Sequence, residues 1–199
     1  MTAKKNEEDR LAGCSFSIYP MSDQFADIII TALEQVDTSK VWINTDEVST
    51  IVRGRIPHVF DVTQAVFLQA AKTGEHVVFS GTFSVGCPGD TEGHSYMAED
   101  DTPANLEISE KTEQDIVAKF ALYPMGGGDY MDVIYRQIEA MKEHGVEVSP
   151  THYETKLAGS AQNVFEGLEK VFLETDKAGS SHTVMTATVS ANSPSLNKG

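Results

Sequence analysis

The side chains that most often carry catalysis or bind metals are thinly spread along this chain. Its 6 histidines lie far apart and form neither an H-x-H nor an H-E-x-x-H pairing, so their spacing predicts no metal site. The sequence also has no G-x-S-x-G turn for a nucleophilic serine and no phosphate-binding P-loop. Gly126-Gly127-Gly128 precede a predicted helix and suit either an anion cradle or a flexible turn, and we favour the turn. We therefore predict no catalytic residue, no bound metal and no cofactor.

A long internal repeat is the strongest pattern in the sequence. The stretch FSIYPM at residues 16–21 returns as FALYPM at residues 120–125, an offset of 104. After one inserted residue, an offset of 105 aligns Val66-Phe67-Leu68 with Val171-Phe172-Leu173 and Gly74 with Gly179. One offset held over about seventy residues predicts the tandem duplication of a small domain.

Both copies show the same succession of hydrophobic patterns. In the first copy, we expect strands at residues 14–19, 41–44, 48–54 and 76–85 and helices at residues 25–36 and 57–73. In the second copy, the matching strands lie at residues 118–123, 149–159 (two strands and a turn) and 182–191, with helices at residues 130–144 and 160–178. The order β-α-β-β-α-β predicts an α+β fold made of two ferredoxin-like units, each an antiparallel sheet with both helices on one face.

Three segments follow from this reading: repeat 1 at residues 11–86, a linker at residues 87–115 and repeat 2 at residues 116–194. The linker holds nine acidic residues and one lysine, which is typical of a solvated connection or surface excursion. Its Tyr96 and Met97 either cap a pocket or remain in solvent. Because the helices cover only one face of each sheet, we expect a second sheet, from the sister copy or from another chain, on the other face. A homodimer is the expected result.

The charge balance limits the classes of partner. With 30 Asp and Glu against 15 Lys and Arg, the net charge is −15, which disfavours nucleic acid and anionic lipid surfaces. The same field favours a cationic ligand, although an acidic surface also simply keeps a protein soluble. No signal peptide is apparent and the apolar runs are far too short to cross a bilayer, so we expect a cytoplasmic protein that is not embedded in a membrane.

Several paired stretches resemble one known family over residues 11–194. They are the strands CSFSIYPM and AKFALYPM, the hairpins TDEVSTIVRG and THYETKLAG, and the helix ends AAKTGEH and TDKAGSS. In this combination they are similar to the YkoF-type proteins that bind thiamin and its precursor hydroxymethylpyrimidine (HMP). The resemblance implies two ferredoxin-like repeats, a homodimer and one pocket per repeat for thiamin or HMP. It further implies a role in salvage or transport of thiamin precursors, beside membrane transport components, and no enzymatic activity.

A pocket for thiamin needs apolar walls, a surface for ring stacking, negative potential and a few polar groups for the aminopyrimidine edge. The candidates in repeat 1 are Ser17, Tyr19, Asn44, Asp46, Ser49 and Thr50. The candidates in repeat 2 are Ala121, Tyr123, His152, Tyr153 and Glu154. Ser17 and Ser49 suit the pyrimidine edge, and the two tyrosines either stack on the ligand or pack beside the following proline. Because Ala121 replaces Ser17 and Glu154 replaces Ser49, we expect two pockets of unequal affinity or preference.

Two other functional classes stay open at this point. Duplicated ferredoxin-like units also occur as small-molecule-sensing regulatory modules, usually beside a catalytic or DNA-binding domain that this chain lacks. An enzyme of thiamin metabolism would need a nucleophile or an acid–base pair in the pocket, and the sequence offers no clear one. A soluble binding protein for thiamin or HMP fits the residues best.

Overall fold

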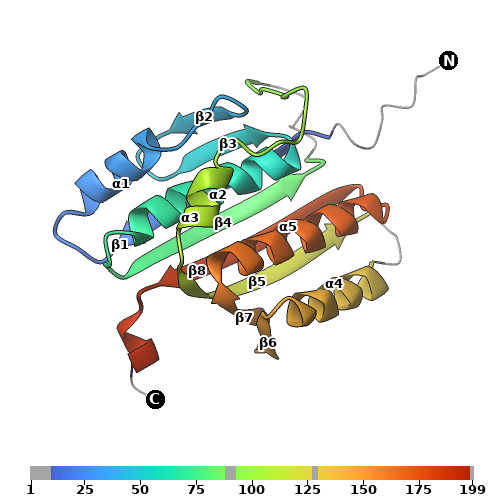
Figure 1. Cartoon of the computed structure of the whole chain (residues 1–199). Helices are drawn as coiled ribbons and strands as arrows, with labels where there is room; N and C mark the ends of the chain where they lie inside the picture. Colours follow the sequence, from blue (N-terminus) through green and yellow to red (C-terminus); the bar gives the residue numbers. More distant parts are fainter. Residues whose placement is uncertain (1–9, 88–92, 127–129, 198–199) are drawn as a thin grey trace.

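The computed structural model describes residues 10–87, 93–126 and 130–197. The elements of the first half are β1 (Ala12–Pro20), α1 (Phe25–Glu34), β2 (Trp42–Thr45), β3 (Thr50–Gly54), α2 (Ile56–Ala71) and β4 (Val77–Val85). Those that follow are α3 (Leu106–Lys111), β5 (Asp115–Met125), α4 (Met131–Glu143), β6 (Glu147–Pro150), β7 (Thr155–Ser160), α5 (Ala161–Lys177), β8 (His182–Ala191) and a short 3₁₀ helix (Pro194–Asn197). Figure 1 shows the two halves side by side.

The predicted β-α-β-β-α-β order is confirmed in both halves. Within each half, the first strand is central: β1 lies between β3 and β4, and β5 lies between β7 and β8. All these pairs are antiparallel. Alternate side chains of β1 are buried under the helices, as the period of two in its sequence predicts. The chain is therefore a tandem α+β protein of ferredoxin-like units.

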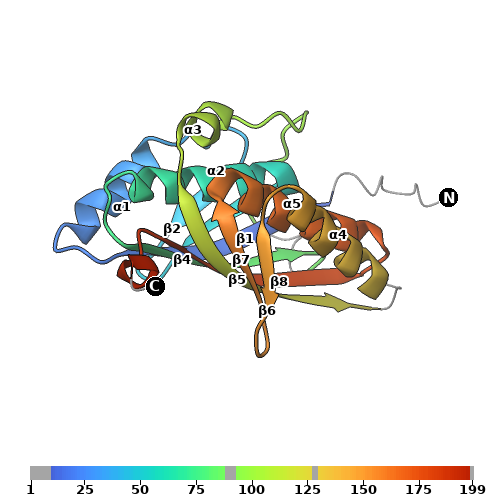
Figure 2. The same cartoon turned by 60° about the horizontal axis from the view of Figure 1, so that its bottom comes forward.

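The two halves join edge to edge in one eight-stranded sheet, with the strand order β2-β3-β1-β4-β8-β5-β7-β6. Strand β4 pairs with β8 along its whole length, from Val77 opposite Ala191 to Val85 opposite Thr183. Of the two expected covers for the open face, the sister copy is therefore wrong, and a second chain stays a prediction. An unpaired β4 or β8 would leave a long row of backbone donors and acceptors, and their pairing satisfies these groups. Figure 2 shows helices α1 to α5 on one side of this sheet.

A single hydrophobic core extends across both repeats. Helices α2 and α5 lie next to each other over the middle of the sheet (Figure 1). The ring of Phe60 in α2 stacks on Phe83 in β4 at 4.3 Å between centroids, and it approaches Phe172 of α5 at 5.9 Å. Since aromatic rings bury large apolar areas, this shared layer makes the two repeats one packed unit.

The described part of the segment between the repeats, residues 93–115, forms more structure than an acidic linker requires. It contains α3, which packs against α2, and its Ala98 and Asn105 are buried. Figure 2 shows α3 lying over α2 on the side away from the sheet. Most of its described residues are exposed, yet several of its polar groups also bind repeat 1.

Candidate ligand-binding site

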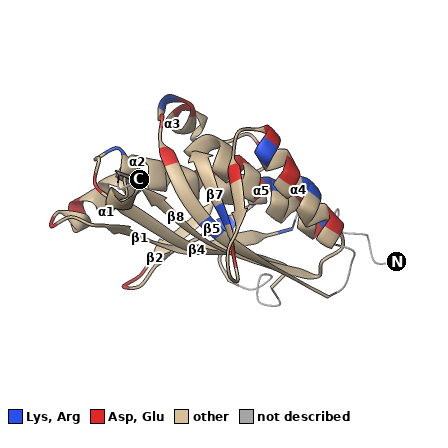
Figure 3. Cartoon of the chain, turned by 90° about the horizontal axis from the view of Figure 1, so that it is seen from below, with Lys and Arg blue, Asp and Glu red and all other residues tan. Residues whose placement is uncertain are grey.

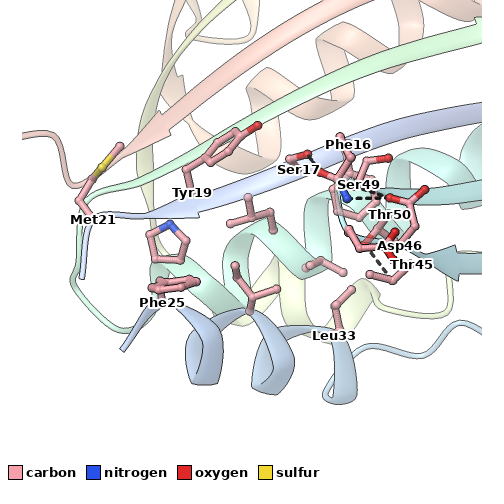
Figure 4. A pocket seen from close by; sticks show the side chains of 16 residues that line it. Phe16, Ser17, Tyr19, Met21, Phe25, Leu33, Thr45, Asp46, Ser49 and Thr50 are labelled. Atoms are coloured by element: carbon pink, nitrogen blue, oxygen red, sulfur yellow. Dashed lines mark hydrogen bonds between the residues drawn. The ribbon is translucent and has the colours of Figure 1, made fainter. Parts of the chain in front are cut away.

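A cavity of about 540 Å³ lies at one corner of repeat 1, between β1, α1 and the turn that joins β2 to β3. It exists because β3 pairs with β1 only as far as Phe16 opposite Thr50, whereas β1 continues to Pro20. Beyond Phe16, the chain from Thr45 to Ser49 turns away and leaves that side of β1 open. Figure 4 shows the hydroxyls and carboxylate of this turn at one end of the cavity and Tyr19 and Phe25 at the other.

The backbone of β1 contributes polar groups to this opening. The N–H of Met21 donates to the carbonyl oxygen of His76 at 2.8 Å, just before β4. In an antiparallel strand, neighbouring residues direct their N–H and C=O groups to opposite sides. The alternation turns the N–H and C=O of Ile18 away from β4, toward the side where β3 has ended. One donor and one acceptor from a single residue thus face the opening, a pattern that suits the edge of an aminopyrimidine.

The walls of the cavity are mainly apolar. Ile29 and Leu33 of α1 form one wall and Val66 of α2 lies deeper. At the rim, Phe25 is 55% exposed, whereas Tyr19, 51% exposed, projects from β1 to the face of the sheet away from the helices, because it alternates with the buried Ile18 and Pro20. An apolar slot with the exposed ring of Phe25 at its mouth fits a flat heterocycle, which can insert between the walls and stack at the rim.

The turn after β2 places negative charge at the same cavity. Oδ1 of Asp46 accepts hydrogen bonds from the backbone N–H of Val48 at 2.8 Å and of Ser49 at 2.9 Å. The bonds from Ser49 and Val48 lower the pKa of Asp46 below its usual value, so its carboxyl is ionised at neutral pH. Glu47 adds a second carboxylate, and none of the 16 lining residues is Lys, Arg or His. Figure 3 shows acidic residues, in red, at the end of β2.

Hydroxyl groups tie the turn to the sheet. Ser17 Oγ donates to the carbonyl oxygen of Val48 at 2.8 Å, and Ser15 Oγ donates to Ser49 Oγ at 3.2 Å. Behind them, the hydroxyls of Thr45 and Thr50 lie 2.9 Å apart. These bonds fix the distance between the turn and β1, and therefore the width of this end of the cavity.

Most of the repeat 1 candidates come together at this cavity. Those that line it are Ser17, Tyr19, Asp46, Ser49 and Thr50. Asn44 does not: it lies exposed on the edge strand β2, opposite Ile51, and is not among the lining residues. Its side chain is on the face of the sheet away from the helices, because the neighbouring Ile43 faces the core opposite Val52.

The matching corner of repeat 2 has the same backbone plan. Phe120 of β5 is opposite Thr155 of β7, as Phe16 is opposite Thr50. The turn closes in the same way, since the N–H of Thr151 donates to the carbonyl oxygen of Glu154 at 3.0 Å. Ala121 and Tyr123 take the places of Ser17 and Tyr19 on β5.

The side chains of this second corner differ from those of the first. Lys119 Nζ lies 3.7 Å from Glu154 Oε2, an ion pair at the positions of Ser15 and Ser49. His152 and Tyr153 lie in the turn, and Tyr153 is 97% exposed with a φ of 70°, in the left-handed region. Gly127 and Gly128, part of the glycine run weighed as an anion cradle, lie outside the described residues.

Sequence reasoning missed Glu47 and the contribution of α1. Phe25, Ile29 and Leu33 share an apolar stripe of the helix predicted at residues 25–36, and we did not predict that they line a cavity. The periodicity of a helix cannot tell a wall of a cavity from a wall of the core. A signal was available, because the paired length of the short hairpin is less than that of the first strand.

Residues 10–87, 93–126 and 130–197 hold no group of three or more His, Cys, Asp or Glu side chains arranged to bind a metal ion. None of the helices in these ranges is long and apolar enough to cross a membrane.

Two comparisons with known proteins show what the sequence of this chain is similar to. The model of the YKOF-related family matches residues 11–90 and 115–196, one match for each repeat. The chain is also 45% identical over 186 residues to a protein of Bacillus subtilis (strain 168) named "Putative HMP/thiamine-binding protein YkoF". That alignment covers 94% of this chain and 92% of the relative.

Proposed function

The chain belongs to the YKOF-related family, and on that premise we propose that it binds thiamin or HMP reversibly, without chemical conversion. The cavity of repeat 1 is the proposed site. The observation that carries the proposal is its composition: a slot with apolar walls that ends in two carboxylates, several hydroxyls and an open backbone edge. Each part of thiamin has a counterpart in that set.

The ring system of the ligand accounts for the apolar and backbone groups. The aminopyrimidine of thiamin and HMP carries donors and acceptors along one edge, which the N–H and C=O of Ile18 and the hydroxyls of Ser17 and Ser49 can satisfy. One face of the ring would lie against the wall that Ile29 and Leu33 form. Burial of a flat ring in this slot supplies most of the binding free energy, and the polar groups select the orientation.

The charge of the cavity selects among thiamin derivatives. Asp46 and Glu47 attract the cationic thiazolium ring, whereas neutral HMP gains nothing from them. A phosphate group would meet two carboxylates and no basic lining side chain. We therefore propose that the site prefers unphosphorylated ligands, with thiamin bound more tightly than its monophosphate.

The wider role is proposed on the same basis. A soluble binder with one pocket in each repeat would supply thiamin precursors during salvage or transport, in the cytoplasm and beside membrane transport components. A homodimer would cover the open face of the eight-stranded sheet. The strongest support is the 45% identity of this chain to the Bacillus subtilis relative, whose name describes it as a putative HMP/thiamine-binding protein.

Calorimetric titration with thiamin, HMP and thiamin monophosphate tests the proposal. We expect heat with the first two ligands and binding of the monophosphate weaker by about tenfold or more. Asp46→Asn keeps an oxygen for the two backbone N–H groups and removes the charge, so it should weaken thiamin about three- to tenfold and leave HMP nearly unchanged. Absence of heat with every ligand would exclude the proposed function, and equal losses for thiamin and HMP would exclude the role of the charge.

A further inference from the structure

The segment between the repeats is fastened across repeat 1 at several points. Residues 94–105 run past the loop that joins α1 to β2 and past the start of α2, as Figure 1 shows above α2. The central contact is Asn105, which precedes α3 and is only 3% exposed. We call residues 94–105 the strap.

The side chain of Asn105 binds that loop as a peptide group would. Its Oδ1 accepts from the N–H of Asp37 at 2.8 Å, and its Nδ2 donates to the carbonyl oxygen of Asp37 at 2.9 Å. The same Nδ2 donates to Asp61 Oδ2 at 2.8 Å, on α2. Asn105 therefore joins the end of α1 to α2, and each polar group of its carboxamide has a partner.

Other contacts hold the strap along its length. Lys40 Nζ donates to Asp100 Oδ1 at 2.7 Å and to the carbonyl oxygen of Thr102 at 2.8 Å. Nearer its start, Arg53 Nη1 donates to the carbonyl oxygen of His94 at 2.7 Å. The ring of His94 stacks on Trp42 with 5.9 Å between centroids. Thus the strap holds the loop from α1 to β2 at both Asp37 and Lys40.

That loop connects two walls of the cavity. Before it, α1 carries Ile29 and Leu33 on one wall. After it, β2 leads directly into the turn with Asp46 and Ser49. A displacement of the loop would change the separation between these walls. Residues of the strap do not line the cavity, so any effect on a ligand acts through the loop.

In repeat 2, the end of α4, the helix that corresponds to α1, is held by a different contact. Asn163 Nδ2 of α5 donates to the carbonyl oxygen of His144 at 2.8 Å, just after α4. The side chain that holds this end therefore comes from α5, the second helix of the same repeat, and not from the segment between the repeats. The strap contacts described above all reach repeat 1, which makes the two corners independent in this respect.

We propose that Asn105 is a positioning residue for the repeat 1 cavity and that the strap sets the affinity of this cavity for its ligand. The inference rests on the proposed binding of thiamin or HMP. By linkage, a strap that increases ligand affinity must itself be held more firmly when the ligand is bound, by the same factor. A purely structural strap would stabilise the fold without this reciprocity.

The first test compares Asn105→Ala with Asn163→Ala, which removes the corresponding clamp in repeat 2. In a thiamin titration, Asn105→Ala should weaken the repeat 1 step about tenfold, because the buried Asn105 side chain and its several hydrogen bonds are lost. Asn163→Ala should leave that step unchanged. Ser49→Ala identifies the repeat 1 step, because it should perturb that step alone. If Asn105→Ala does not fold, Lys40→Ala releases the strap at Asp100 and Thr102 and should weaken the same step about threefold.

The second test measures reciprocity in the unmodified protein. Thiamin should slow hydrogen exchange of the backbone amides of residues 100–105 about tenfold, matching the affinity loss in Asn105→Ala. It should also alter the emission of Trp42, the single tryptophan of the chain, which stacks on the strap. Unchanged exchange with thiamin bound, or unchanged affinity in Asn105→Ala, would overturn the inference and leave the proposed function standing. A wild-type protein that gives no heat with thiamin would instead overturn the proposed function and, with it, the inference.

Discussion

The corner of repeat 1 and the corner of repeat 2 share their backbone and differ in the side chains that can contact a ligand. At the first, Ser15 and Ser49 are joined by a hydrogen bond, and at the second, Lys119 and Glu154 form an ion pair. The tyrosine and proline that follow on the first strand of each repeat are the same. Duplication has thus kept the residues that shape the corner and changed those that would select a ligand.

The two corners also differ in charge and enclosure. The turn of repeat 1 carries Asp46 and Glu47, whereas the equivalent positions of repeat 2 are Thr151 and His152. Ile18 is buried in the first corner, and its counterpart Leu122 is partly exposed in the second. A cationic ligand therefore finds less negative charge and less apolar cover in repeat 2.

Filling the repeat 1 cavity should separate the two corners most clearly. Ile29→Trp places an indole in the space between α1 and β1, so thiamin affinity of one site should fall about a hundredfold or more while the other site is unaffected. Ile30→Trp is the matched control, because Ile30 is the next residue of α1, is exposed and does not line the cavity. Calorimetry measures both variants, and equal loss at two sites would show that the corners do not act separately.

The joint between the repeats should respond to pH. Burial, together with the nearby carboxylates of Glu166 and Asp61, raises the pKa of Glu169 to about 7. Since the folded pKa is above the unfolded value near 4.5, this group's contribution to stability is complete below about pH 4.5 and is lost as the pH rises through about 7. Glu169→Gln removes that loss, so it should stabilise the protein by about 1–3 kcal/mol at pH 8 relative to wild type.

Thermal unfolding at pH 5 and pH 8 checks this expectation. The gain from Glu169→Gln should be much smaller at pH 5, where the wild-type carboxyl is already largely protonated. Glu143→Gln, at the exposed end of α4, is the control. Because Glu169 is on α5 and Asp61 is on α2, a single cooperative transition that shifts as a whole would show that both repeats unfold as one unit. Equal gains at both pH values would contradict the burial of a charge as the cause.

Exchanging one hydroxyl should give the smallest effect and test the comparison directly. Ser17→Ala gives repeat 1 the residue of repeat 2 and removes the bond to the carbonyl oxygen of Val48. It should weaken the repeat 1 site about five- to tenfold, as the loss of one hydrogen bond does. Ala121→Ser makes the reverse change in repeat 2. If selectivity lies in these positions, the two affinities converge in the double variant; if they stay apart, the ion pair and the turn charges carry the difference.

The framework of this fold could be predicted because local patterns determine it. Alternation in the strands, helical stripes and one long offset are enough to give two units and their internal strand order. The pairing of β4 with β8 could not be predicted in the same way. Nothing in the sequence of Val77–Val85 distinguishes an edge that meets the sister repeat from one that meets another chain, since both satisfy the same backbone groups.

The site was predicted in part for a similar reason. Ser17, Asp46 and Ser49 were predicted because the expected sheet order places the first and third strands side by side, and a thiamin pocket needs polar groups there; all three line the cavity. The wall of α1 was missed, because apolar side chains look the same whether they face a core or a cavity. The contacts of Asn105 were also missed, since they join residues 37, 61 and 105 across three elements and leave no periodic trace in the sequence.

The seam between β4 and β8 has a consequence for any attempt to express one repeat alone. A fragment that ends at the linker would present the bare edge of β4, 9 residues long, and a fragment that starts there would present β8, 10 residues long. Such long unshielded edges recruit other strands, so each isolated half would dimerise or aggregate. The outer edges of the intact sheet, β2 and β6, have 4 residues each, so they are too short to pair extensively with strands of another molecule. Because both halves belong to one chain, β4 and β8 pair with each other, and neither strand edge is left to bind another molecule.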